Sequence, residues 1–168
     1  YYLYRQKYIH PETKNVFERT GFFALVKLER FYEQSIYPHE KTLAAPKIDR
    51  LHLMKATASH LSPVFGLYNE PTGALQTVLT ETVPSLPLYK PYKDSDGTEH
   101  YLWRITDTEH SAKIAEHLAD KKIIIADGHH RYETALQYQA YMRDEEGSGS
   151  SERPYDYVLM CLVNSNDP

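Results

Sequence analysis

The sequence has little of what several classes of protein require. It contains one cysteine, Cys161, among 168 residues, so no disulfide can form within the chain, as is typical of proteins from a reducing compartment. No apolar segment approaches the roughly 20 residues that a membrane-spanning helix needs, and no signal-peptide pattern is present. Lysine and arginine form no run and the formal net charge is −4, which argues against a surface for duplex DNA. These shortages predict a cytoplasmic protein without a membrane segment and without DNA as a partner.

What remains is an ordinary globular composition. Apolar residues make up 41% and charged residues 25% of the chain, and its length allows one domain with a substantial core. The chain begins at Tyr1 in a strand-like segment and stops in the turn-like segment 164–168. We therefore expect residues 1–168 to form a single domain that is a fragment of a longer protein.

Residue alternation and helical spacing predict both strands and helices. Strands are expected over residues 1–9, 16–28, 63–69, 98–106 and 155–163, the first two as a hairpin. Helices are expected after Pro46, after Gly73 and over residues 107–119, the first with Ile48, Leu51, Met54 and Ala58 facing inward. Cys161 lies in an apolar run and should be buried. The fold class that follows is α+β, with a mixed, mostly antiparallel sheet flanked by helices.

The stretch KIIIADGHHRYETAL, residues 122–136, carries the clearest candidate site. Its three isoleucines predict a strand buried on both faces. A turn at Asp127-Gly128 follows, and then a helix for which Asp127 would be the N-cap. Free N–H groups at a helix N-terminus attract anions, and the residues beside them favour phosphate: Gly128, His129, His130 and Arg131. The alternative is that Asp127 only caps the helix and the histidines are solvated.

Two upstream segments carry further candidates. His39-Glu40-Lys41-Thr42 places an acid, a base and a hydroxyl within four residues, although a solvated loop is an equally good interpretation. The helix after Pro46 would carry Lys47 and Arg50, whose charges suit phosphate oxygens. A transition-metal site built from His39, Asp127, His129 and His130 is disfavoured, because adjacent helical residues point about 100° apart.

Several motifs together resemble a known family, the domain of unknown function 1015 family. They are Tyr2-Leu3-Tyr4-Arg5-Gln6, His39-Glu40-x-Thr42, Pro46-Lys47-x-Asp49-Arg50, Ser62-Pro63-Val64-Phe65, His100-x-x-Trp103-Arg104 and Ala126-Asp127-Gly128-His129-His130-Arg131. The resemblance covers nearly all of the chain. The last motif is also similar to the phosphate-binding turn of the ParB/sulfiredoxin superfamily, which includes free-serine kinases. A ParB/sulfiredoxin-like fold is what this resemblance implies.

The resemblance also implies a function, a Mg²⁺-dependent phosphotransferase that acts on a small hydroxylated metabolite and binds ADP, ATP or CTP. Gly128, His129, His130 and Arg131 would hold phosphate, with Lys47 and Arg50 nearby. The candidate catalytic residues are Glu40, Asp127 and His129, and Asp127 and Glu40 would hold Mg²⁺. The alternative is a ParB-like regulatory module that binds nucleotide without catalysis or hydrolyses it slowly. The chain departs from the relatives in that a histidine stands where sulfiredoxin has its cysteine, and no helix-turn-helix segment is visible.

Overall fold

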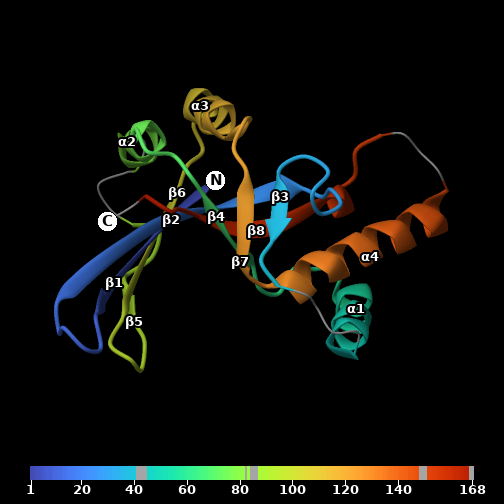
Figure 1. The fold of residues 1–168 in the computed structure, drawn as a ribbon, viewed down its shortest axis with the longest axis horizontal. Coiled ribbons are helices and arrows are strands. Elements are labelled where there is room, and N and C mark those ends of the chain that lie inside the picture. Colours follow the sequence, from blue (N-terminus) through green and yellow to red (C-terminus); the bar gives the residue numbers. More distant parts are fainter. Residues whose placement is uncertain (41–44, 82, 84–86, 148–150, 167–168) are drawn as a thin grey trace. The chain divides into compact units, whose positions relative to one another are not determined.

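The chain divides into two compact units in a computed structural model that describes residues 1–40, 45–81, 83, 87–147 and 151–166 (Figure 1). Unit 1 comprises residues 1–23, 68–121 and 162–168, and unit 2 comprises residues 24–67 and 122–161. Each unit is described below by itself. The expectation that residues 1–168 fold as one domain stays a prediction.

The described part of the chain contains eight strands, four α-helices and one short 3₁₀ helix, η1. The strands are β1 (Tyr2–Ile9), β2 (Val16–Lys27), β3 (Ile36–Pro38), β4 (Val64–Tyr68), β5 (Tyr92–Lys93), β6 (Glu99–Arg104), β7 (Ile123–Asp127) and β8 (Tyr157–Asn164). The helices are α1 (Ala45–Thr57), α2 (Ala74–Glu81), α3 (Thr108–Leu118), α4 (His129–Glu146) and η1 (Pro154–Asp156).

These strands form one mixed sheet in the order β3-β7-β4-β8-β2-β1-β6-β5. β3 and β7 are parallel, whereas β1 is antiparallel to both β2 and β6, and β5 is antiparallel to β6. The predicted α+β class with a mixed sheet is therefore confirmed. No helix within the described ranges is long and apolar enough to cross a membrane.

Unit 1 is built on the predicted hairpin of β1 and β2, whose register runs from Tyr2 opposite Phe23 to Ile9 opposite Val16. Leu3 of β1 lies opposite Phe22 of β2 and Trp103 of β6, and all three are buried, as the alternation of each strand requires. Helices α2 and α3 pack against each other. The N-cap of α3 is Asp107, whose carboxylate accepts a hydrogen bond from the His110 N–H (2.9 Å).

Unit 2 contains β3, β7, α1 and α4, and it corrects two predictions about burial. Ile123 and Ile125 of β7 are buried, but Ile124 is 49% exposed, so this strand is not covered on both faces. Helix α1 packs against α4, yet Ile48 is 58% exposed and Ala58 lies beyond the helix end with φ of 46°. The helix after Pro46 is thus confirmed. The prediction that Ile48 and Ala58 lie on its inward face was wrong.

Helix α4 begins as predicted, although its cap differs from the prediction. The N-cap residue is Gly128, with φ of 93°, and it has no side-chain capping bond. Asp127 is the last residue of β7, and its carboxylate binds the Arg131 side chain instead of the helix amides. A left-handed backbone at the cap position needs glycine, which explains why the capping role predicted for Asp127 was wrong.

Gly21 provides a test of the packing of unit 1, because β8 passes very close to it. A Cβ at this position would lie 2.6 Å from the Leu162 carbonyl oxygen and 2.7 Å from Val163 Cγ2. We expect Gly21→Ala to lower the free energy of unfolding by about 1–3 kcal/mol, since backbone must shift to relieve the overlap. Urea unfolding measures this loss. Glu18→Ala, at an exposed position of the same strand, is the control. An equally small effect of both substitutions would contradict the close contact between Gly21 and β8.

Candidate functional site

The candidate site of unit 2 is organised by the parallel pairing of β3 with β7. Ile36 lies opposite Ile123 and Pro38 opposite Ile125, so both strands end at the same edge of the sheet. His39 and Glu40 follow β3 there, and Gly128 with the start of α4 follows β7. Carboxyl ends of parallel strands are the usual position for ligands in such sheets. The pairing therefore brings together two motifs that are far apart in the sequence. Residues 41 and 42 of the upstream motif lie outside the described residues.

His129 is the buried centre of this edge. Its side chain is only 1% exposed, and its ring meets that of His39 edge-on, with centroids 4.5 Å apart. The backbone N–H of His39 donates a hydrogen bond to His129 Nε2 (3.2 Å). In the neutral ring the proton therefore sits on Nδ1. Burial lowers the pKa of His129 below its ordinary value, although the nearby carboxylate of Glu40 acts in the opposite direction.

Glu40 faces the proton-bearing side of that ring. Its Oε1 lies 3.1 Å from His129 Nδ1, but the angle does not make a hydrogen bond, and Nδ1 has no other hydrogen-bond partner among the described residues. A buried polar atom without a partner costs free energy. The Glu40 side chain is 54% exposed. The site thus pairs a buried imidazole with a solvent-facing carboxylate.

Arg131 closes over the turn at Gly128. Its guanidinium donates hydrogen bonds to the Asp127 carboxylate and the Pro63 carbonyl, and a longer one (3.3 Å) to Ser62 Oγ. A Cβ on residue 128 would lie 2.8 Å from Arg131 Nε and 2.9 Å from its Cζ. Only glycine therefore accommodates both the left-handed backbone and the arginine above it. The Asp127, Gly128 and Arg131 group predicted from the sequence is brought together by this turn.

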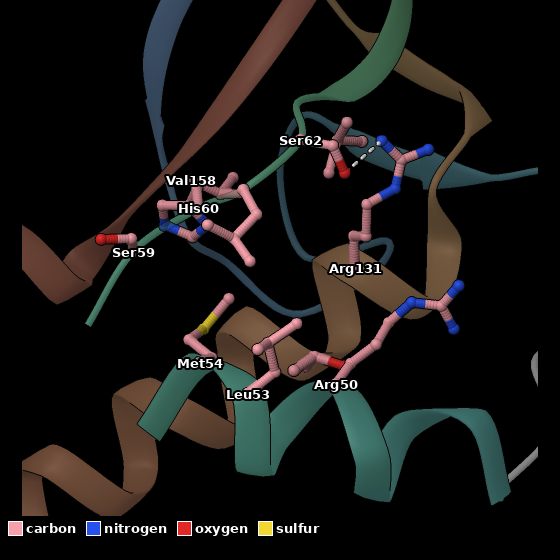
Figure 2. Close-up of a pocket in the computed structure, with 11 residues that line it drawn as sticks. Arg50, Leu53, Met54, Ser59, His60, Ser62, Arg131 and Val158 are labelled. Atoms are coloured by element: carbon pink, nitrogen blue, oxygen red, sulfur yellow. Dashed lines mark hydrogen bonds between the residues drawn. The ribbon is translucent and has the colours of Figure 1, made fainter. Parts of the chain in front are cut away.

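Beside Arg131 lies a cavity of about 370 Å³ within unit 2 (Figure 2). Its lining is formed by Arg50, Leu53, Met54, Ser59, His60, Leu61, Ser62, Val64, Arg131, Thr134 and Val158. In Figure 2 the guanidinium ends of Arg50 and Arg131 extend toward one side, while His60 and Val158 lie at the other. His60 Nε2 donates to the Tyr157 carbonyl (3.1 Å). An apolar floor with a few convergent polar groups is the usual character of a small-molecule site.

Four of the six predicted phosphate ligands are not part of this cavity lining: Gly128, His129, His130 and Lys47. Lys47 Nζ lies 2.6 Å from Glu133 Oε2, and the side chains of this pair are 18% and 25% exposed. This ion pair joins α1 to α4, which gives Lys47 a structural role. The carbonyl of His130 accepts a hydrogen bond from Thr134 Oγ1 (2.6 Å). Arg50, in contrast, lines the cavity together with Arg131.

The position of β3 depends on Glu29. The carboxylate of Glu29 accepts hydrogen bonds from the backbone N–H groups of Ser35 (2.5 Å) and Ile36 (2.7 Å). Its own backbone is held by Tyr132 of α4, whose hydroxyl donates to the Glu29 carbonyl (2.9 Å) and accepts from the Glu29 N–H (3.1 Å). Burial raises the pKa of Tyr132 to about 12, so the hydroxyl keeps its proton. Helix α4 thus fixes the start of the strand that leads to Glu40.

The side chains considered for a transition-metal site contact one another or other groups within the described part of the chain. Among the residues that the structure describes, no group of three or more His, Cys, Asp or Glu side chains is arranged to hold a metal ion. The carboxylate of Asp127 is engaged with Arg131, and the rings of His39 and His129 pack against each other. The two carboxylates predicted for Mg²⁺, Asp127 and Glu40, remain candidates only for a metal that is held chiefly by a bound phosphate.

Sequence reasoning missed the segment from Ser59 to Val64 as part of the site. Ser59, His60 and Ser62 supply polar atoms to the cavity, and Ser62 and Pro63 bind Arg131. The available signal was a run of polar residues immediately before a strand, in a segment that contains a proline. Its position beside Arg131 depends on the sheet, which local patterns do not predict. Glu29 and Tyr132 were missed for the same reason.

The described site thus combines a cavity that is lined by two arginines with a glycine turn that opens a helix. The whole chain, residues 1–168, matches the model of the family described as "Protein of unknown function (DUF1015)", and the chain belongs to this family. No curated protein and no solved structure matches it. The family resemblance seen in the motifs is therefore confirmed, whereas the similarity to the ParB/sulfiredoxin superfamily and its kinases stays a prediction.

The buried neutral state of His129 predicts a dependence of stability on pH. Its folded pKa lies below the unfolded value of about 6.5, so the unfolded chain takes up the proton first as the pH falls. The stabilisation is fully present above the unfolded pKa and is lost as the pH decreases through it. We expect the free energy of unfolding to fall as the pH is lowered from 7.5 to 5. It should fall less steeply in the His129→Gln variant. Denaturant unfolding at both pH values measures the slopes. The exposed His52→Gln is the control and should keep the wild-type slope; a parallel loss in all three proteins would contradict the assignment.

Proposed function

We propose that unit 2 binds a nucleotide and transfers its terminal phosphoryl group to the hydroxyl of a small metabolite, in a fold of the ParB/sulfiredoxin type. The observation that carries this proposal is the convergence of Glu40, His129 and the Arg131 turn at one sheet edge, beside a cavity that also holds Arg50. Arginines neutralise phosphate oxygens, and a nearby carboxylate is the group that phosphoryl transfer needs for the acceptor proton.

The residues present fit such a ligand. Arg50, Arg131, Ser59 and Ser62 offer donors on the lining of the cavity, and Leu53, Met54, Val64 and Val158 offer an apolar floor for a nucleobase. Gly128 has no Cβ that would fill the turn, and His129 Nδ1 is a buried donor without a hydrogen-bond partner among the described residues. In this proposal Arg50 and Arg131 bind the phosphates.

Glu40 is the residue that would make the site catalytic. Its carboxylate is solvent-facing and lies 3.1 Å from Nδ1 of the buried His129, an arrangement that would orient it. It would accept the proton of the acceptor hydroxyl as the new O–P bond forms and the bond to the nucleotide breaks. Alternatively, Glu40 would serve beside Asp127 as a carboxylate ligand of Mg²⁺ bound to phosphate, and the ion would neutralise the charge that develops.

A second function is favoured by one specific observation, the ion pair between Asp127 and Arg131. While this pair persists, the carboxylate proposed for Mg²⁺ is occupied and the arginine is only partly available to phosphate. Such a site would bind a nucleotide as a regulatory module and hydrolyse it slowly or not at all. Under this alternative, opening of the pair on binding would be the regulated event. A cytoplasmic location remains part of both proposals.

Nucleotide binding is tested by thermal unfolding with ADP, ATP, CTP and GTP, each with and without Mg²⁺. A ligand that binds only the folded state raises its stability, and each kcal/mol should raise Tm by about 2–4 °C for a chain of this size. We expect at least one nucleotide to raise Tm and Arg50→Gln to remove most of the shift. Arg50 is exposed, so its replacement should not unfold the protein, unlike Arg131→Ala. Lys113→Gln in unit 1 is the matched control. The absence of a shift with every nucleotide would overturn both proposed functions.

Catalysis is tested by Glu40→Gln. We expect the rate of nucleotide-dependent phosphoryl transfer to fall by about 10²–10⁴-fold, since the general base is lost, while the nucleotide-induced Tm shift is kept. Product formation from ATP or ADP with pooled hydroxylated metabolites, followed by phosphorus NMR, measures the rate. Binding without transfer in the wild-type protein would favour the regulatory module, and an unchanged rate in the variant would remove Glu40 from the mechanism.

A further inference from the structure

The cavity of unit 2 has two chemically different ends. Figure 2 shows the guanidinium ends of Arg50 and Arg131 extending toward one side, and His60 with Ser59 at the other. The rest of the lining is mostly apolar, with the side chains of Leu53, Met54, Leu61, Val64 and Val158. The proposed function assigns the phosphates of a nucleotide to the two arginines. The nucleobase of the same ligand then lies toward His60.

His60 presents a hydrogen-bond acceptor to this cavity. Its Nε2 lies 3.1 Å from the carbonyl oxygen of Tyr157. A carbonyl can only accept, so in the neutral ring the proton is on Nε2 and Nδ1 carries a lone pair. Nδ1 has no hydrogen-bond partner in the described part of the chain, and it is not one of the buried polar atoms that lack a partner there. The lone pair of Nδ1 is therefore accessible to a ligand.

Two hydroxyls of the lining are engaged with the main chain. Ser59 Oγ donates to the Thr57 carbonyl (2.9 Å), and Thr134 Oγ1 donates to the His130 carbonyl (2.6 Å). While these bonds persist, each hydroxyl oxygen can only accept from a ligand. The end of the cavity at His60 and Ser59 therefore suits a ligand group that donates hydrogen bonds.

These acceptors distinguish nucleobases by their exocyclic groups. Adenine and cytosine carry an amino group, which donates, at the position where guanine and uracil carry a carbonyl oxygen. An amino group opposite His60 Nδ1 completes a hydrogen bond, whereas a carbonyl oxygen there would face a second lone pair and leave both atoms unpaired. Because His60 is only partly buried, the discrimination should be that of one hydrogen bond.

We propose, on the basis of the proposed function, that His60 selects the nucleobase of the bound nucleotide. Its Nδ1 accepts a hydrogen bond from the exocyclic amino group of adenine or cytosine, and the base packs on the apolar part of the lining. The site therefore takes an adenine or cytosine nucleotide in preference to a guanine or uracil nucleotide.

Isothermal titration calorimetry with the whole protein at pH 8, where imidazoles are neutral, tests this selection with two pairs of nucleotides in the presence of Mg²⁺. ATP is paired with purine riboside 5′-triphosphate, which lacks only the amino group, and CTP is paired with UTP. In each pair that binds, we expect the amino-bearing nucleotide to bind about fivefold to tenfold more tightly, the usual net value of one hydrogen bond. If none of these nucleotides binds, the proposed function fails together with the selection. Equal affinities within a pair that binds overturn only the role of His60.

Substitution of His60 tests whether its lone pair causes the preference. His60→Phe should weaken the amino-bearing nucleotide to the affinity of the other member of its pair, whose own affinity stays unchanged. His60→Lys is the second variant, because lysine keeps a donor for the Tyr157 carbonyl but has no acceptor, and it should also lose the preference. His52→Phe, at an exposed position of α1, is the matched control and should keep it.

Arg50→Gln separates the two ends of the cavity. Arg131 is bonded to the Asp127 carboxylate, so the positive charge at the arginine end is partly offset, and the loss of Arg50 should weaken both members of a pair by the same factor. The preference for the amino-bearing nucleotide should remain. The proposal is overturned if the preference survives in His60→Phe or His60→Lys, if His52→Phe loses it to the same extent, or if Arg50→Gln abolishes it.

Discussion

The parallel pairing of β3 with β7 is the interaction on which the candidate site depends. β3 has only three residues, Ile36–Pro38, and so short a strand has few ladder hydrogen bonds of its own. The Glu29 carboxylate compensates by accepting the N–H groups at its start, and Tyr132 holds the backbone of Glu29. The consequence is that the helix following the glycine turn also fixes the strand that carries Glu40. Both halves of the site are therefore positioned by one helix, α4.

One arginine at the turn has two roles that exclude each other. Arg131 stabilises the turn by hydrogen bonding to the Asp127 carboxylate and the Pro63 carbonyl, and in the proposed function it would also bind the phosphate. A charge that is half-buried and satisfied by its own neighbours is weaker as a ligand, because binding must first break those bonds. The phosphate of the proposed function would have to compete with a carboxylate and a carbonyl together. Glycine at position 128 is what makes the closed state sterically accessible.

Local patterns predicted the regular parts of the fold and failed where long-range contacts decide. The β1–β2 hairpin, the strand before Asp127 and the helices after Pro46 and Gly128 follow from alternation, turn residues and helical spacing, and all of them form. β3 was not predicted, because three residues are too few for a periodic signal. The pairing of Lys47 with Glu133 depends on how α1 packs against α4, and the predicted role of Lys47 in binding phosphate stays a prediction. The exposure of Ile48 and Ile124 likewise reflects which faces of an element other elements cover, and the sequence of one element does not contain that information.

The same reasoning explains why Glu40 and His129 are more informative as a pair than either is alone. A histidine that is 1% exposed would ordinarily belong to the core, and a half-exposed glutamate in a loop would ordinarily be solvated. Because Glu40 Oε1 lies 3.1 Å from His129 Nδ1, neither residue can be interpreted without the other. The backbone N–H of His39 occupies Nε2 and forces the proton onto Nδ1, so the ring presents a donor to the carboxylate at a depth where water does not replace it. The Glu40 side chain is 54% exposed, so its carboxylate faces both this ring and solvent, as the proposed general base would have to do. In the proposed mechanism, the buried imidazole would therefore position Glu40, and the exposed acid would be the group that reacts.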